Sequence, residues 1–163
     1  MTAAGAGRTA RQADVEKRDK GMEDKYGPLK LENQVCFPLY AAAREMIRRY
    51  KPSLDALDLT YTQYIAMMVL WEEGAVTVKA LGAKLYLDSG TLTPLLKKLE
   101  AKGLVTRARS LEDERNLIVS LTPEGLALRE RALCVPARMA QCTQLTPEEA
   151  ATLYRLLYKL LRT

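Results

Sequence analysis

The 163-residue sequence contains no histidine. Histidine is the usual general base, the partner of serine and cysteine nucleophiles, and the commonest metal ligand, so its absence argues against many enzyme and metal sites. The three cysteines are an odd number at irregular positions and include no C-x-x-C pair. This usage argues against a disulfide framework and a structural zinc site, and it is typical of thiols kept reduced. We therefore expect no metal and no cofactor.

Long apolar runs are also missing. No run approaches the roughly 20 residues that cross a bilayer, and the first residues contain neither an apolar signal region nor a small-residue cleavage site. We expect a cytoplasmic protein without a membrane partner. The hydrophobic content of 48% is enough to bury a core, and the aromatic content of 6% with 28% charged residues favours a mostly helical domain. The net charge of +5 makes a polyanion such as nucleic acid a candidate partner.

The first half of the chain predicts a tail and two helices. Residues 1–28 lack sustained apolar periodicity and contain the Gly27-Pro28 turn signal, which indicates a flexible tail. Apolar residues at helical spacing predict an amphipathic helix over 31–50, ended by Pro52. A second helix should begin after Thr60 or Thr62 and close at Gly74, and its apolar residues on all sides place it at the centre of the fold.

The middle of the chain predicts a helix-turn-helix unit. A short helix over 78–85 is followed by a turn at 88–90 and by a longer helix that ends at Gly103. Leucines at i, i+3, i+4 and i+7 fix the inward face of the longer helix, namely Leu92, Leu95, Leu96 and Leu99. Its outward face then carries Thr91, Thr93, Pro94, Lys97 and Lys98. Hydroxyls and lysines suit a major groove, although an ordinary surface helix shows the same residue types.

The segment "LVTRARSLEDERNLIVSLT" predicts a β-hairpin with a charged tip. An arginine-bearing tip fits the narrow, negatively charged minor groove. Two helices and a charged hairpin in this order form a winged helix, an arrangement more specific than any of its parts. The DNA-contacting residues expected from this unit are Ser89, Thr91, Thr93, Pro94, Lys97, Lys98, Arg107, Arg109, Asp113 and Arg115.

The end of the chain is helical again. Thr122 before Pro123 is a typical helix start, and Thr146 with Glu149 has the spacing of a capping box before a leucine-rich last helix. The expected fold is therefore mainly α with a small β wing. Its parts are a tail (1–28) and a winged-helix domain (29–163) that contains a DNA-binding region (about 60–122) and dimerisation helices (29–58 and 123–163).

Three segments in one order carry a family resemblance: "NQVCFPLY", "LYLDSGTLTPLLKKLEAKGLVTR" and "DERNLIVSLTPEG". From about Leu29 to the end, the sequence resembles the MarR-family winged-helix repressors, and more narrowly the organic hydroperoxide resistance regulators. The resemblance implies a homodimer on double-stranded palindromic operator DNA. It also implies that organic hydroperoxides oxidise Cys36 to a sulfenic acid, and that Tyr40, Tyr50 and Tyr61 surround that sulfur.

The fate of the oxidised sulfur is open at this point. In some relatives a second cysteine from the partner subunit resolves the sulfenic acid, which favours Cys142 over Cys134 here; in others a low-molecular-weight thiol does so. Both cysteines could equally be packing residues, and Cys36 itself could be an inert core thiol. Two other functions are open: a repressor gated by a small aromatic ligand in a pocket lined by Tyr40, Tyr50, Tyr61 and Trp71, and a thiol peroxidase.

Overall fold

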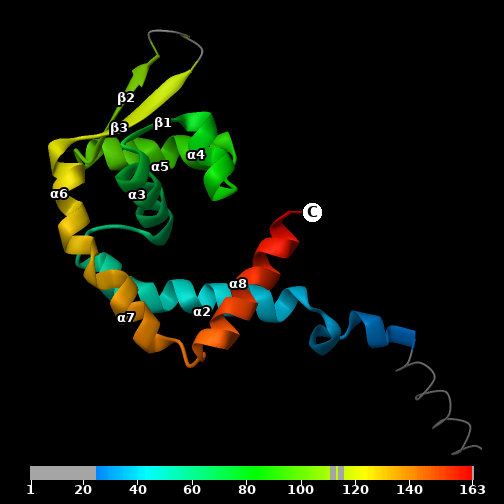
Figure 1. Ribbon diagram of the computed structural model, residues 1–163. Helices are drawn as coiled ribbons and strands as arrows, with labels where there is room; N and C mark the ends of the chain where they lie inside the picture. Colours follow the sequence, from blue (N-terminus) through cyan, green and yellow to red (C-terminus); the bar gives the residue numbers. More distant parts are fainter. Residues whose placement is uncertain (1–24, 111–112, 114–115, 163) are drawn as a thin grey trace, which may run out of the picture. The chain divides into compact units, whose positions relative to one another are not determined.

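The computed structural model describes residues 25–110, 113 and 116–162 (Figure 1). The chain forms two compact units, Met1–Met46 and Ile47–Thr163. The boundary between the units falls inside a helix, so the expected division into tail, DNA-binding region and dimerisation helices stays a prediction.

Helix α2 spans Cys36–Asp55 and begins five residues later than the sequence predicted. Two 3-10 turns precede it, η1 (Gly27–Leu29) and η2 (Leu31–Asn33), and Gln34 is extended. Pro38 explains the late start: proline has no N–H to donate, so it is tolerated in the first helical turn and disrupts an interior one. A helix beginning at Leu31 would place Pro38 in its interior.

The prediction that Pro52 ends this helix was wrong, because α2 continues past it to Asp55. A proline disfavours helical geometry at the preceding residue and removes one hydrogen bond. Tertiary packing outweighs that cost here, since Ser53 and Leu54 are 8% and 2% exposed. The ammonium of Lys51 also lies 2.7 Å from a carboxylate oxygen of Asp55, across the last turn.

Helix α3 (Tyr61–Glu73) is the central helix that its sequence predicted. Thr60 caps it in a reciprocal capping box with Gln63, which decides between the two threonines considered. Gly74 ends it with a positive φ of 76°. Ala66, Met67 and Leu70 are fully buried, so α3 supplies much of the core of the second unit.

Helices α4 (Val78–Leu85) and α5 (Ser89–Ala101) form the helix-turn-helix unit (Figure 1). Ser89 and Gly90, expected in the turn, are the first residues of α5, because the Asp88 carboxylate accepts the Thr91 N–H and so acts as the N-cap. The helices pack closely at Gly82. A Cβ there would lie 2.8 Å from the Leu87 carbonyl oxygen and 2.9 Å from a Leu92 methyl carbon.

The wing is part of a three-stranded antiparallel sheet. Strands β2 (Val105–Arg109) and β3 (Leu117–Leu121) form the predicted hairpin, and Figure 1 shows it projecting beside α4 and α5. A third strand, β1 (Ala75–Thr77), pairs with the other edge of β3 and was not predicted. The observed fold is the predicted one, mainly α with a small β wing.

Three helices complete the chain: α6 (Pro123–Ala132), α7 (Cys134–Cys142) and α8 (Pro147–Leu161). Thr122 caps α6 ahead of Pro123, and Thr146 forms a capping box with Glu149, both as predicted. Helix α8 has no buried residue within Pro147–Leu161. It leaves six large apolar side chains exposed: Leu153, Tyr154, Leu156, Tyr158, Leu160 and Leu161.

Candidate functional site

Helix α5 presents the outward face that the leucine spacing predicted. Leu92, Leu95, Leu96 and Leu99 are between 0% and 7% exposed, and the opposite side chains of Thr91, Thr93, Pro94, Lys97 and Lys98 are exposed, as is that of Ser89. Lys97 and Lys98 form no ion pair with another residue in the described part of the chain. Two ammonium groups are therefore available to a polyanion on this face.

The start of α5 is organised by Asp88. Its carboxylate accepts the Thr91 N–H at 2.9 Å and the Thr91 hydroxyl at 3.0 Å. These two hydrogen bonds hold the pKa of Asp88 below its usual range, so the cap is ionised at neutral pH. The Thr93 hydroxyl donates to the Ser89 carbonyl at 2.8 Å. Both threonine hydroxyls are thus oriented before any DNA is bound, which lowers the entropic cost of using them.

The wing arginines have different surroundings. Arg107 is half-buried, and its Nε donates to a Glu100 carboxylate oxygen at 3.0 Å, joining β2 to α5. Arg109 is exposed at the end of β2. Asp113 accepts a hydrogen bond from the Asn116 side-chain amide at 3.1 Å, which ties Asp113 to the residue just before β3. Arg115 lies outside the described residues, and the DNA contacts of all four residues stay predictions.

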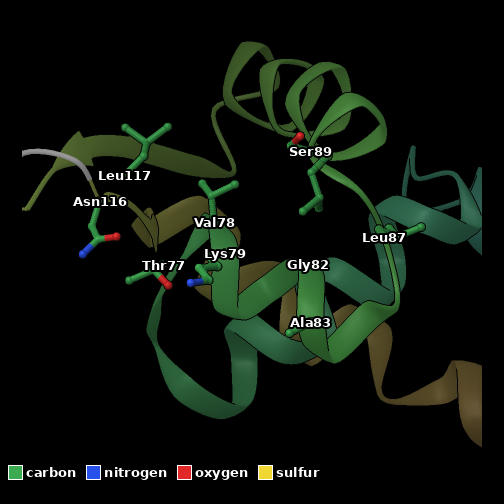
Figure 2. A pocket seen from close by; sticks show the side chains of 10 residues that line it. Thr77, Val78, Lys79, Gly82, Ala83, Leu87, Ser89, Asn116 and Leu117 are labelled. Carbon is green, nitrogen blue, oxygen red and sulfur yellow. The ribbon is translucent and has the colours of Figure 1, made fainter. Parts of the chain in front are cut away.

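A hollow of about 410 Å³ lies between α4, the start of α5 and the loop end of strand β3 (Figure 2). Thr77, Lys79, Ser89 and Asn116 contribute polar groups to it, and its other walls are aliphatic. Of these four residues, the sequence analysis identified only Ser89. Lys79 was missed because it belongs to the first helix of the unit, and Asn116 because its position depends on the hairpin register.

Cys36 is exposed and is the first residue of α2. Tyr40 follows four residues later, on the same face of the helix, and is 57% exposed. Arg44, a further turn along, donates to the Tyr40 hydroxyl oxygen at 3.1 Å. Cys36 therefore presents its thiol at the exposed start of α2, one helical turn before Tyr40.

An aromatic cluster lies in the second unit. The rings of Tyr50 and Tyr61 are 5.1 Å apart, Tyr64 is 6.0 Å from Tyr50, and Trp71 is 6.2 Å from Tyr64. Burial, and then the proximity of Tyr61, raises the pKa of Tyr50, while burial, Tyr50 and Tyr61 raise that of Tyr64. These two phenols therefore keep their protons at neutral pH and are hydrogen-bond donors. Cys36 and Tyr40 belong to the other unit, so the support of Cys36 by Tyr50 and Tyr61 stays a prediction.

Tyr64 was missed by the sequence analysis, although it lies one helical turn after Tyr61 on α3. With Met68, Trp71 and Arg129 it lines a second hollow, of about 420 Å³, between α3 and the α6–α7 segment. The Trp71 indole N–H is engaged by the Gly125 carbonyl at 2.8 Å. The walls of this hollow combine aromatic rings with one arginine and one glutamate, Glu72, and suit a small aromatic ligand.

The two remaining cysteines are the first and last residues of α7. Cys134 is exposed, and its thiol donates to the Arg131 carbonyl at 3.5 Å. Cys142 is the last residue of α7. A resolving role for either cysteine stays a prediction.

Within the described residues, no helix is both long and apolar enough to cross a membrane. The same part of the chain contains no group of three or more Cys, Asp or Glu side chains that could hold a metal ion.

Known proteins match the chain over most of its length. Residues 48–131 match the family model described as transcriptional regulator SarA/Rot. The organic hydroperoxide resistance transcriptional regulator of Bacillus subtilis is 51% identical over 142 residues, which are 87% of this chain and 97% of that protein.

Solved structures agree with this match. AbfR of Staphylococcus epidermidis has been solved in reduced form bound to DNA; it is 34% identical, with 86% of this chain and 97% of that chain covered and a TM-score of 0.70. The overoxidised form of AbfR bound to DNA is 36% identical, with coverages of 85% and 97% and a TM-score of 0.69. Fold, identity and coverage agree: the chain belongs to the MarR-type winged-helix transcriptional regulators, in the organic hydroperoxide resistance subgroup.

Proposed function

We propose that this chain is a homodimeric repressor that binds palindromic operator DNA and releases it when an organic hydroperoxide oxidises Cys36. The observation that carries the proposal is the exposed Cys36 thiol at the start of α2, in a chain that covers 97% of the Bacillus subtilis organic hydroperoxide regulator. The DNA-binding surface consists of the β2–β3 wing and the exposed face of α5, which carries Ser89, Thr91, Thr93, Pro94, Lys97 and Lys98.

The chemistry at Cys36 is a two-electron oxidation. The thiolate sulfur attacks the terminal oxygen of the hydroperoxide, and an S–O bond forms as the O–O bond breaks. The alkoxide takes up a proton and leaves as an alcohol, and the cysteine is left as a sulfenic acid. Condensation with a second thiol, from Cys142, Cys134 or a small-molecule thiol, then gives a disulfide and water.

A positive neighbour assists the proposed reaction. The Arg44 guanidinium donates to the Tyr40 hydroxyl oxygen and lies 5.5 Å from the centre of the Tyr40 ring. A phenol whose oxygen accepts from a cation is a stronger donor through its own O–H. Tyr40 is therefore suited to donate to an anionic sulfur one helical turn away.

The exposed apolar face of α8 supports the homodimer. An isolated helix of 15 residues is marginal in water, and most helical stability comes from packing of the apolar face. The exposed leucines and tyrosines of α8 form such a face, and a second copy of the chain would cover it. Covering the face on both subunits would remove the exposed apolar surface that a soluble monomer rarely keeps.

Two variants of α8 test the dimer. Leu156→Glu places a charge on the apolar face, and Arg155→Glu places the same acid on the opposite face of the same helix. Sedimentation equilibrium should show a dimer for the wild type and for Arg155→Glu, and a shift toward monomer for Leu156→Glu. A wild-type monomer at micromolar concentration would contradict this part of the proposal.

The reaction at Cys36 is tested by trapping. One equivalent of cumene hydroperoxide followed by dimedone should label Cys36 in a variant with both other cysteines replaced by serine, as measured by mass spectrometry of the peptides. Labelling should disappear when Cys36 is also serine. Turnover of many equivalents of peroxide with a thiol reductant would instead indicate a peroxidase. The relatives are named as transcriptional regulators and not as peroxidases.

The hollow beside Trp71 favours one second candidate, a repressor gated by a small aromatic acid. Arg129 could pair with a carboxylate there, and Tyr64, Met68 and Trp71 would hold the ring. This function predicts that the Cys36→Ser variant still releases DNA fully when the aromatic acid binds. The redox function predicts that the same variant stays bound to DNA in the presence of peroxide.

A further inference from the structure

We infer that the hollow between α4, α5 and the start of β3 receives one phosphate of the operator backbone in each half-site, with the Lys79 ammonium as its counter-charge. The inference rests on the proposed DNA binding and deepens it by naming the backbone site and the residue that serves it. Neither the family resemblance nor the helix-turn-helix pattern assigns Lys79 a role.

The position of the hollow points to the operator. Its walls come from the three elements of the reading head: Val78 to Ala83 on α4, Ser89 and Leu92 on α5, and Asn116 and Leu117 at the start of β3. Figure 2 shows Lys79 on the side of the hollow that faces the wing residues and Ser89 on the opposite, α5 side. A duplex contacted by both α5 and the wing would pass over the opening between them.

The polar groups of the hollow match a phosphate ester. Lys79 is exposed and forms no ion pair or hydrogen bond with another described residue, so its positive charge is uncompensated in the described part of the chain. The Ser89 hydroxyl also donates to no described residue, whereas Asn116 is tied to Asp113 at 3.1 Å. An ammonium and a hydroxyl are common donors to phosphate oxygens in protein–DNA complexes.

The remaining walls favour a sugar-phosphate over an aromatic effector. They are formed by the aliphatic side chains of Val78, Ala83, Leu87, Leu92 and Leu117, and no aromatic side chain of the described residues lines the hollow. A deoxyribose ring packs against aliphatic surface, whereas the aromatic walls of the other hollow suit a planar ring. The volume of about 410 Å³ is ample for a sugar and its phosphate.

The test compares Lys79→Gln with Lys51→Gln. Both changes remove one positive charge from an exposed helical lysine, and glutamine has a similar helix propensity, so both variants should fold. Lys51 pairs with Asp55 on α2 and lies outside the reading head. The measurement is the dissociation constant for the operator, by fluorescence anisotropy, at salt concentrations from 50 to 200 mM.

If Lys79 neutralises one phosphate per half-site, a dimer of Lys79→Gln loses two contacts, and the slope of log K against log salt should become shallower by about 1.8. Lys51→Gln should keep the wild-type slope. A neutral methylphosphonate placed at each backbone position in turn should weaken wild-type binding at one position per half-site and should not weaken Lys79→Gln further there.

The outcomes separate the inference from the proposed function. A wild type that binds no duplex from its own promoter region would overturn the proposed function and this site with it. Two results would overturn the phosphate site alone, provided that the wild type binds the operator. In one, Lys79→Gln keeps the wild-type salt slope. In the other, the affinity losses caused by the methylphosphonate and by Lys79→Gln add up at every backbone position. If salicylate weakens operator binding by the wild type but not by Lys79→Gln, the hollow binds a small acid and not a phosphate. This result would overturn the inference.

Discussion

The junction between the wing and α6 offers a sharp test of the packing. Gly125, in the first turn of α6, lies so close to the chain at Leu104 that a Cβ would overlap the Leu104 carbonyl oxygen and lie 2.9 Å from its carbon. Ordinary contacts of this kind begin at 3.4 Å. Gly125→Ala therefore requires the start of α6 or the Leu104 turn to move.

The magnitude follows from what the movement strains. Overpacking costs about 1–3 kcal/mol. The shift also strains the Trp71 hydrogen bond to the Gly125 carbonyl and the Thr122 cap on the Gly125 N–H, each worth about 1 kcal/mol. Alanine returns about 1 kcal/mol through its higher helix propensity. The expected net loss is about 2–4 kcal/mol in the free energy of unfolding.

Urea unfolding followed by circular dichroism measures this loss as a lower midpoint at unchanged slope. Gly27→Ala is the matched control, because nothing lies within 4 Å of a Cβ at that position. It should stay within about 0.5 kcal/mol of the wild type. A Gly125→Ala protein with the wild-type midpoint would refute the close approach of α6 to Leu104.

Three further predictions concern the reading head and its support. Because the Arg107 hydrogen bond lowers the pKa of Glu100, the ionised carboxylate stabilises the folded state above the unfolded pKa of about 4.3, and this contribution is lost as the pH falls through the folded value; Glu100→Gln should therefore lower the melting temperature at pH 7 and make no difference near pH 2. Leu96→Ala, at a side chain 1% exposed, should cost about 2–5 kcal/mol in chemical denaturation, whereas Thr91→Ala on the exposed face should cost far less and act on operator affinity instead. Thr146→Ala removes the capping box of α8 and should lower stability by about 1 kcal/mol, which thermal unfolding at fixed protein concentration would detect; no change would indicate that α8 is held by packing alone.

Local signals predicted the helix-turn-helix unit well. The spacing of four leucines gave both faces of α5, and the observed burial confirms each of them. The caps at Thr60, Thr122 and Thr146 are local as well, since a cap depends on residues only three positions apart. Such features could be read from the sequence because their energies are decided within one helical turn.

The errors arose where tertiary contacts decide the structure. Burial of Leu54 holds α2 together beyond Pro52, against the local preference. Strand β1 has only three residues, too few to show a periodic pattern, and it is stabilised by pairing with the edge of β3. The sequence pattern therefore did not predict it. The pairing of Arg107 with Glu100 and the hollow beside Lys79 depend on how the wing folds back onto the helices, which no short window of sequence specifies.

In the proposed function, oxidation of Cys36 controls DNA binding. Since overoxidised AbfR has itself been solved on DNA, the oxidant should be limited to one equivalent and its effect reversed with dithiothreitol. The measurement is operator affinity, by fluorescence anisotropy, for wild type and Cys36→Ser before and after cumene hydroperoxide. We expect the wild type to lose about a hundredfold or more in operator affinity, equivalent to about 3 kcal/mol, and to regain it on reduction. The operator affinity of Cys36→Ser should not change. Release of both proteins, or of neither, would contradict it.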